Sequence, residues 1–320
     1  MDNIRKVKLM ALAMQRYPWE QGVLAQAFLE SGDEEETILL AREAVHRQSD
    51  DGRPAMVGTP HPVTDPCVNG EAIKFAYEHT KDPIFAQALE RMKDWALHKA
   101  PRSKDGLVHH NADHPELWVD SFYMLPPYLA CIGEYKEAMK QINGYWDALF
   151  VEEKGLLGHI YDEAAQKWVR RDVWATGNGW AIAAMARVID SLPDDMESDK
   201  QILISHVKQI VDSALKYQRE DGLFYDVIDN PDTFVETNFT QMTAYTIYRG
   251  VTSGWLSESY IPYADAMRNA AVGKIDEYGL VTGSCGAPDF MKSGESVEAQ
   301  SFCILMEAAR DRYVSSRPRA

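Results

Sequence analysis

The sequence has no apolar run long enough to cross a bilayer. A membrane-spanning helix needs about 20 predominantly apolar residues, whereas the N-terminal run at 9–14 is only six residues long before Gln15 and Arg16 interrupt it. That run is also too short for the apolar region of a signal peptide, and its surroundings look amphipathic. The sequence therefore predicts a protein that works away from the membrane.

Cysteines at metal-binding or redox spacing are also absent. The four cysteines, Cys67, Cys131, Cys285 and Cys303, lie far apart and form no CxxC or Cys/His pattern. Neither a zinc site nor a disulfide framework is indicated by such spacing. We therefore expect no metal, no cofactor and a reduced, cytoplasmic location.

An excess of positive charge is the third feature that the sequence lacks. The 33 Lys and Arg residues are outnumbered by 49 Asp and Glu residues, so the formal net charge is −16. A field of that sign repels nucleic acid and anionic membranes before any contact forms. These partners are excluded, whereas a short anionic ligand in a locally basic pocket is not.

Sustained strand alternation is hard to find, and helical periodicity takes its place. Apolar residues recur at three- and four-residue steps within 19–29, 38–45, 72–77 and 85–96, which is typical of helices. With 320 residues and 45% apolar composition, the chain can bury a large core. The sequence predicts an all-α protein.

A short phrase with a central glycine recurs between the predicted helices. The glycines are Gly52, Gly106, Gly155, Gly222 and Gly279, spaced by 54, 49, 67 and 57 residues. Such a period accommodates two helices with their connections, and glycine suits a turn that needs positive φ. The period alone does not choose between an open solenoid and a closed ring, but no polar capping repeat is evident. We favour a single (α/α)6 barrel over residues 1–320.

One carboxylate stands inside the apolar run 117–125. Asp120 would be costly to desolvate unless it is paired or protonated, so it is the first candidate for acid–base chemistry, with a pKa raised by burial. Asp113 as N-cap and Pro115 in the first turn predict that a helix begins before Asp120. The alternative is an ordinary buried Asp that caps a loop or pairs with an Arg.

Further polar clusters lie near the predicted loops. Asp65 precedes a helix and could merely cap it. His109, His110 and His114 surround the start of the Asp120 segment at spacings that match no zinc site. A lone histidine such as His159 is usually structural.

Residues 174–180 read Trp-Ala-Thr-Gly-Asn-Gly-Trp and precede an apolar helical stretch. Glycines around Asn178 at a helix start would expose backbone N–H groups to an anion such as a carboxylate. The phrase lacks the Lys-Ser/Thr ending of a phosphate loop. Aromatic rings at a polar pocket suit the faces of sugars, so a sugar acid is the better match.

The phrases Leu-Trp-Val-Asp-Ser-Phe-Tyr-Met (117–124) and Trp-Ala-Thr-Gly-Asn-Gly-Trp, in this order, resemble glycoside hydrolase family 105, the unsaturated rhamnogalacturonyl hydrolases. The unsaturated glucuronyl hydrolases of family 88 are close relatives. The resemblance covers roughly residues 19–310. It implies an (α/α)6 barrel that acts on small oligosaccharides whose non-reducing end is a 4,5-unsaturated uronic acid.

The resemblance also implies roles for individual residues. Asp120 falls on the general acid/base, and Asp65 on the carboxylate that holds substrate hydroxyls and helps to set the protonation state of Asp120. The implied substrate-binding positions are His109, Trp118, His159, Trp174, Thr176, Gly177, Asn178 and Trp180. Family members commonly have Arg where this chain has Thr176, so another basic residue or the backbone N–H groups of 177–179 should meet the substrate carboxylate.

The implied chemistry is hydration of an enol ether. C4 takes a proton, C5 takes water, and the resulting hemiketal opens and expels the rest of the sugar chain, with one carboxyl group acting first as acid and then as base. Two alternatives stay open. Asp65 and Asp120 could form the inverting pair of a glycosidase that cleaves a saturated glycan, or the chain could be a helical-repeat binding protein without catalysis.

Overall fold

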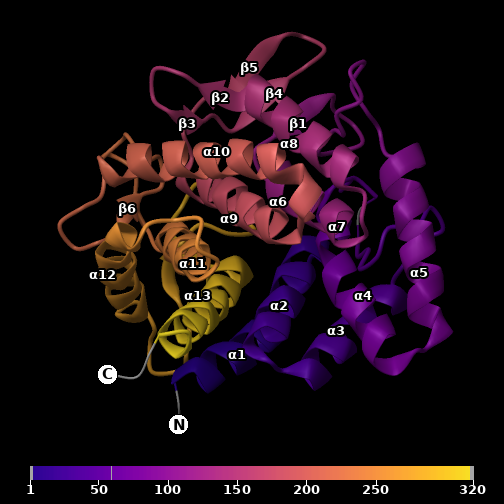
Figure 1. The fold of residues 1–320 in the computed structure, drawn as a ribbon, viewed down its shortest axis with the longest axis horizontal. Helices are drawn as coiled ribbons and strands as arrows, with labels where there is room; N and C mark the ends of the chain where they lie inside the picture. Colours follow the sequence, from indigo (N-terminus) through magenta and orange to yellow (C-terminus); the bar gives the residue numbers. More distant parts are fainter. Residues whose placement is uncertain (1–2, 59, 318–320) are drawn as a thin grey trace. The chain divides into compact units, whose positions relative to one another are not determined.

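The computed structural model describes residues 3–58 and 60–317, in which helices predominate (Figure 1). The contacts between residues divide the chain into two compact units. Unit 1 comprises Met1–Met14, Val151–Leu157 and Asp172–Ala320, and unit 2 comprises Gln15–Phe150 and Gly158–Arg171. The all-α prediction is confirmed, and the single catalytic domain over 1–320 stays a prediction.

Unit 2 consists of helical hairpins followed by a small sheet. Its helices are α2 (Pro18–Ser31), α3 (Glu34–His46), η1 (Asp65–Asn69), α4 (Gly70–Thr80), α5 (Pro83–Asp94), η2 (Trp95–Lys99), α6 (Ser121–Met124), α7 (Pro126–Cys131) and α8 (Tyr135–Leu149). Its strands β1 (Glu116–Trp118), β4 (Ile160–Asp162) and β5 (Lys167–Arg170) form one sheet in the order β1-β4-β5. Consecutive helices pack as the pairs α2/α3, α4/α5 and α7/α8.

The burial pattern of unit 2 follows from its sequence. Helix α5 buries Phe85, Ala88 and Met92, which lie on one face at three- and four-residue steps. Its N-cap Asp82 accepts the Ile84 N–H over 3.0 Å, so the helix begins where the polar side chain replaces the missing backbone acceptor. Helix α2 is buried on almost every side. Helix α2 is therefore a core element, whereas α5 covers the core with one buried face.

Unit 1 repeats the same arrangement. Its helices are α1 (Asn3–Met14), α9 (Ala175–Ser191), η3 (Asp194–Met196), α10 (Glu197–Leu215), α11 (Asn238–Thr252), η4 (Glu258–Tyr260), α12 (Ile261–Val272) and α13 (Val297–Ser315). Its short strands are β3 (Leu156–Leu157), β6 (Phe224–Tyr225), β7 (Val235–Glu236), β8 (Thr282–Ser284) and β9 (Gly294–Glu295), and β2 (Phe150–Val151) lies at its boundary. Helices α9 and α11 are buried almost throughout, and α13 is buried over its first half. Helix α10 packs on α9, and α12 packs on α11.

The first helix of the chain packs against the last. Helix α1 contacts α13, and the two are side by side in Figure 1, indigo against yellow. Val7 and Ala11 form the buried face of α1, and the Val7 carbonyl accepts a hydrogen bond from the Gln300 amide over 3.2 Å. The N-terminal segment thus supplies the outer partner that α13 lacks in its own part of the sequence.

All five glycines of the recurring phrase adopt positive φ. The angles are 111° at Gly52, 84° at Gly106, 65° at Gly155, 86° at Gly222 and 88° at Gly279. Residues with a Cβ rarely adopt this conformation, and each glycine follows the outer helix of a hairpin. The predicted hairpin period is confirmed.

The prediction that a helix begins before Asp120 is wrong. Residues 116–118 form strand β1, which pairs antiparallel with β4, and a helix begins only at Ser121. Leu117 is buried between the more exposed Glu116 and Trp118, an alternation too short to read as a strand in the sequence. Among residues 3–58 and 60–317, no helix is both long and apolar enough for a membrane span.

Candidate active site

Asp120 lies in the turn between β1 and α6. The antiparallel register places Trp118 opposite Ile160, and the Val119 N–H donates to the His159 carbonyl over 3.0 Å. This pairing puts Oδ2 of Asp120 at 3.4 Å from Nε2 of His159. The contact is longer than an ideal hydrogen bond, as catalytic contacts often are before substrate binds.

Asp65 faces a second imidazole. Nε2 of His110 is 3.7 Å from Oδ1 of Asp65. The other ring nitrogen of His110 lies 3.0 Å from the Thr64 hydroxyl and 3.1 Å from the Ser121 hydroxyl. Since each hydroxyl belongs to a neighbour in sequence of one of the two candidate carboxylates, His110 links the Asp65 and Asp120 segments.

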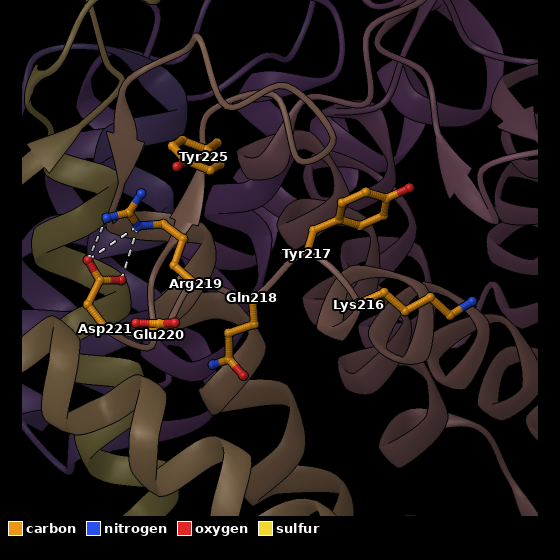
Figure 2. A pocket seen from close by; sticks show the side chains of 7 residues that line it. All are labelled: Lys216, Tyr217, Gln218, Arg219, Glu220, Asp221 and Tyr225. Carbon is orange, nitrogen blue, oxygen red and sulfur yellow. Dashed lines mark hydrogen bonds and ion pairs between the residues drawn. The ribbon is translucent and has the colours of Figure 1, made fainter.

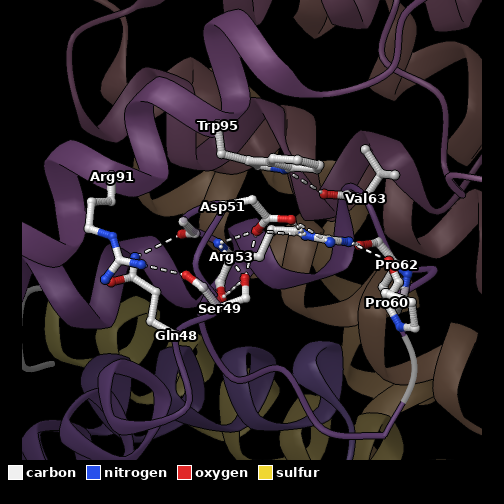
Figure 3. A network of polar contacts seen from close by, with 10 residues as sticks. Gln48, Ser49, Asp51, Arg53, Pro60, Pro62, Val63, Arg91 and Trp95 are labelled. Atoms are coloured by element: carbon white, nitrogen blue, oxygen red, sulfur yellow. Dashed lines mark hydrogen bonds and ion pairs between the residues drawn. The ribbon is translucent and has the colours of Figure 1, made fainter.

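Arg53 fixes the segment that leads into Asp65. Its Nη1 donates to the carbonyls of Pro60 and Pro62, each over 2.6 Å, and its guanidinium lies 4.4 Å from the centre of the Trp95 ring (Figure 3). Buried carbonyls need such partners, because an unpaired one costs the full desolvation penalty. The loop before Asp65 is therefore held by a cation and an aromatic ring.

Trp118 packs between the two imidazoles. Its ring stacks on His110 with a centroid distance of 4.6 Å and meets His159 edge-on at 5.5 Å. The indole N–H donates to Oε2 of Glu116 over 2.8 Å. The ring that the resemblance places in the sugar site also fixes the two histidines that face the carboxylates.

The His109 side chain faces Glu163, whereas that of His110 faces Asp65. Nε2 of His109 lies 3.6 Å from Oε2 of Glu163, and in the described part of the chain it is buried with no hydrogen-bond partner. A buried polar atom without a partner is costly, which fits a group that awaits a ligand. The sequence interpretation singled out His109 and overlooked the role of its neighbour His110.

The two carboxyl groups have pKa values that are displaced in opposite directions. Burial and the nearby charge of Asp120 outweigh His110 and raise the pKa of Asp65 to about 6. Burial also acts on Asp120, but the hydrogen bond from His159, and the charges of His159 and His110 when protonated, bring its pKa below the ordinary value. The expected upward shift at Asp120 is wrong, because the sequence does not show that two imidazoles face this carboxyl group.

The phrase at 174–180 starts a helix instead of preceding one. Helix α9 begins at Ala175, so the Asn178 N–H donates to the Trp174 carbonyl over 3.1 Å and is not available to an anion. The Asn178 amide, fully buried, donates to the carbonyls of Leu157 and Trp174 and accepts the Leu157 N–H, each over 2.9 Å. Asn178 thus has a structural role, which ties β3 to α9, and its substrate contact stays a prediction.

Trp174 and Thr176 also make contacts within unit 1. The Trp174 indole N–H donates to Oδ1 of Asp226 over 3.0 Å. The Thr176 hydroxyl is 3.3 Å from Sγ of Cys285, and Thr176 is almost fully buried. The position where the resemblance led us to expect Arg is thus filled by a small hydroxyl that pairs with a thiol.

Gly177 and Trp180 complete the predicted binding residues of unit 1. Gly177 lies in the first turn of α9, and Trp180 is buried with its ring edge-on to Phe302 at 5.4 Å. At Gly179, a Cβ would come within 2.3 Å of the Met242 sulfur, so only glycine allows this packing. Substrate binding by Trp174, Thr176, Gly177 and Trp180 stays a prediction.

Glu236 is a buried carboxyl group that the sequence interpretation did not single out. Its two oxygens accept the N–H groups of Asn238 and Phe239 over 2.9 and 2.6 Å at the start of α11. Burial raises its pKa to about 8 against these hydrogen bonds, with a further upward contribution from Asp226. Glu236 thus caps a helix and holds a proton at neutral pH.

This raised pKa predicts how stability depends on pH. The folded state binds a proton more tightly than the unfolded state, so stability falls as pH rises from about 4.5 toward about 8. Because a tenfold difference in proton affinity corresponds to roughly 1.4 kcal/mol, the loss should reach several kcal/mol, and Glu236→Gln should flatten the dependence. Denaturant unfolding at pH 5 and pH 8.5 measures it, with Glu220→Gln at an exposed position as control. Equal pH dependence in wild type and Glu236→Gln would contradict this account.

A hollow of about 570 Å³ on the surface of unit 1 is a weaker candidate (Figure 2). Arg219 pairs with Asp221 at 2.9 Å and lies 4.8 Å from the centre of the Tyr225 ring. Its charged side chains neutralise one another, and none of the residues that line it is fully buried. The pKa of its Asp221 carboxyl group is lowered, chiefly by the hydrogen bond from Arg219, and the described residues that line the hollow form no carboxyl–imidazole pair, so the pairs of unit 2 are the better candidate.

The helical hairpins of this chain form the (α/α)6 fold. The sequence profile of Glycosyl Hydrolase Family 88 matches residues 1–302, and the chain belongs to this family. The unsaturated rhamnogalacturonyl hydrolase YesR from Bacillus subtilis is 25% identical over 300 residues, which cover 87% of this chain and 82% of that protein.

Solved structures show the same fold. A family 105 glycoside hydrolase from C. acetobutylicum has a TM-score of 0.83 at 18% identity, over 98% of this chain and 99% of that chain. A family 88 glycosyl hydrolase from Bacteroides vulgatus has a TM-score of 0.77 at 18% identity, over 98% of both chains. The predicted (α/α)6 fold and the resemblance to families 105 and 88 are confirmed.

Proposed function

We propose that this protein is an unsaturated uronyl hydrolase, which releases a 4,5-unsaturated uronic acid from the non-reducing end of a small oligosaccharide. The observation that carries the proposal is the pair of carboxyl–imidazole contacts, Asp120 with His159 and Asp65 with His110. The name of the relative YesR supports the substrate class. The acidic net charge of −16 argues against nucleic acid as a partner.

In the proposed reaction, Asp120 acts as acid and then as base. Its proton goes to C4 of the enol ether, the cation at C5 takes a water molecule, and Asp120 recovers a proton from that water. The hemiketal at C5 then opens, and the remaining sugar leaves with a hydroxyl group. No other carboxyl group has to attack the sugar, unlike in ordinary retaining glycosidases.

The low pKa of Asp120 in the free protein constrains this mechanism. Because Asp120 is ionised at neutral pH before substrate binds, the acid form has to be generated in the complex. A uronate carboxylate supplies a negative charge near the site, and a like charge disfavours ionisation of a neighbouring carboxyl group. An anionic substrate therefore promotes protonation of its own catalyst, whereas a neutral sugar would not.

The test is the ultraviolet absorbance of the conjugated substrate. Hydration removes the C4=C5 double bond, so absorbance should fall as unsaturated di- and oligosaccharides are consumed. The saturated analogues should be left intact. Stable absorbance together with cleavage of a saturated glycan would instead establish the inverting glycosidase, which the separated pKa values of Asp65 and Asp120 also permit. Binding without turnover of either substrate would support the non-catalytic alternative.

We also propose that the protein acts in the cytoplasm. Its four cysteines have no spacing typical of a disulfide framework, and a small oligosaccharide is a substrate that can be imported before its final cleavage. Fractionation of the source cells, with the absorbance assay applied to each fraction, tests this location.

A further inference from the structure

Arg170 lies beside the imidazole that contacts Asp120. It is the last residue of β5, and the antiparallel register of β4 and β5 places it opposite Ile160, the residue after His159. Side chains alternate along β5, with Val169 exposed and Arg170 more buried. The sheet therefore directs the guanidinium to the His159 side, where Nη1 comes within 3.2 Å of Nδ1 of the ring.

The chemistry of this contact determines the direction of the hydrogen bond. A guanidinium group has five N–H donors and no acceptor, and it stays protonated in proteins. Nδ1 of His159 must then accept, which requires a lone pair on that nitrogen. The proton of the neutral ring is consequently on Nε2, the nitrogen that stands 3.4 Å from Oδ2 of Asp120.

We infer that Arg170 is a positioning residue, which occupies the Nδ1 lone pair of His159 and thereby keeps the ring proton on Nε2, the nitrogen that lies 3.4 Å from the Asp120 carboxyl group. Which nitrogen of a histidine is protonated is generally set by the hydrogen bond that the other nitrogen makes. Arg170, Asp120 and the ring of Trp118 are the groups whose contacts with His159 define this arrangement.

The position of the ring proton matters because Asp120 has to change its protonation state twice in the proposed reaction. The inference rests on that proposed function. A fixed Nε2–H donor stabilises the carboxylate that receives the proton from water. With the proton on Nδ1 instead, the lone pair of Nε2 would face the carboxylate oxygen and repel it. If the ring proton exchanged between Nε2 and Nδ1, only the protein molecules with the proton on Nε2 could stabilise the Asp120 carboxylate.

Nitrogen NMR of the substrate-free protein tests the inference without any assay of activity. In protein with ¹⁵N-labelled histidine, the His159 signals are assigned by their loss in His159→Gln. Wild type should show a protonated Nε2 and an unprotonated Nδ1 near neutral pH. Arg170→Met, which removes the donor, should show exchange with other protonation forms, whereas Arg170→Gln, which keeps an N–H donor, should preserve the wild-type pattern in part. A spectrum of Arg170→Met identical to wild type would overturn the inference.

Kinetic measurements on the same variants provide a second test of the inference. Removing the partner that orients a metal-ligating histidine typically costs about 10–100-fold. We expect a loss of similar size in kcat for Arg170→Met, together with a change in its pH profile. Arg170→Lys should recover part of the rate. The adjacent Arg171, whose guanidinium lies over the Trp168 ring at 5.9 Å, provides the control Arg171→Met. A rise in KM alone would assign Arg170 to the substrate carboxylate and contradict the positioning role.

The NMR and kinetic tests distinguish a failure of this inference from a failure of the proposed function. If no unsaturated substrate is consumed, the proposed function fails, and the NMR spectra still decide whether Arg170 sets the protonated nitrogen of His159. If substrate is consumed and the spectra do not respond to Arg170→Met, only the positioning role fails.

Discussion

Replacing Asp120 by Asn should reduce the single-turnover rate of enol-ether consumption by about 10⁴-fold while substrate binding survives. The amide keeps the shape and hydrogen-bonding capacity of the carboxyl group but has no exchangeable acid proton. General acid–base groups typically contribute about 10²–10⁴-fold, and Asp120 is proposed to serve both proton transfers. Loss of absorbance in stopped-flow or manual mixing experiments, with excess enzyme over an unsaturated disaccharide, measures the rate.

A matched control uses a carboxylate outside the site. Asp105, exposed in the turn before His109, can be replaced by Asn in the same unit, and Asp105→Asn should keep the wild-type rate. Wild-type rates in Asp120→Asn would remove the residue from the mechanism and favour the binding-protein alternative. A lost rate with lost binding would indicate a structural role instead.

Replacing Asp65 by Asn should impair turnover most strongly above about pH 6, the pKa of this carboxyl group. Above that pH the wild-type side chain is ionised, and its charge disfavours ionisation of Asp120. Without that charge the pKa of Asp120 falls further, and lowering this pKa by about one reduces the acid form about tenfold at neutral pH. The ratio of wild-type to Asp65→Asn rates should therefore rise as pH increases through this range. A ratio independent of pH would contradict the electrostatic role.

The same two substitutions should change stability with opposite signs. Asp65 has a raised pKa in the folded protein, so its ionisation destabilises the fold as pH rises from 3.8 toward about 6. Asp65→Asn should then unfold at higher denaturant concentration than wild type at pH 7. Asp120 has a lowered pKa, so its ionised form stabilises the fold above 3.8, and Asp120→Asn should be less stable. Denaturant unfolding at pH 4 and pH 7 measures both effects, and changes of the same sign at pH 7 would disprove the assignment.

The histidines show where sequence interpretation reached its limit at the site. His109 and His110 are adjacent and chemically identical, and the resemblance favours His109. Their side chains leave the backbone in different directions, so only His110 reaches Asp65, at 3.7 Å, whereas His109 turns to Glu163. No spacing rule distinguishes the two, because the difference depends on the path of the segment around them.

The lowered pKa of Asp120 has the same origin. A run of apolar neighbours in sequence indicated a desolvated carboxyl group, and burial is indeed the largest single influence on it. The opposing influence comes from His159, which is 39 positions away along the chain. Strands β1 and β4 bring the two together, and each has only three residues, too few for a recognisable alternation.

The sequence by itself determined the helical class, the hairpin period and the family, because these depend on local properties. Apolar residues at helical steps specify a buried face, and glycine is required wherever a turn adopts positive φ, as at Gly222. Only the tertiary structure decided which groups meet at Asp120. The partners His159 and Arg170 arrive there through strand pairing between distant segments, and hydrogen bonds between such segments leave no periodic trace in the sequence.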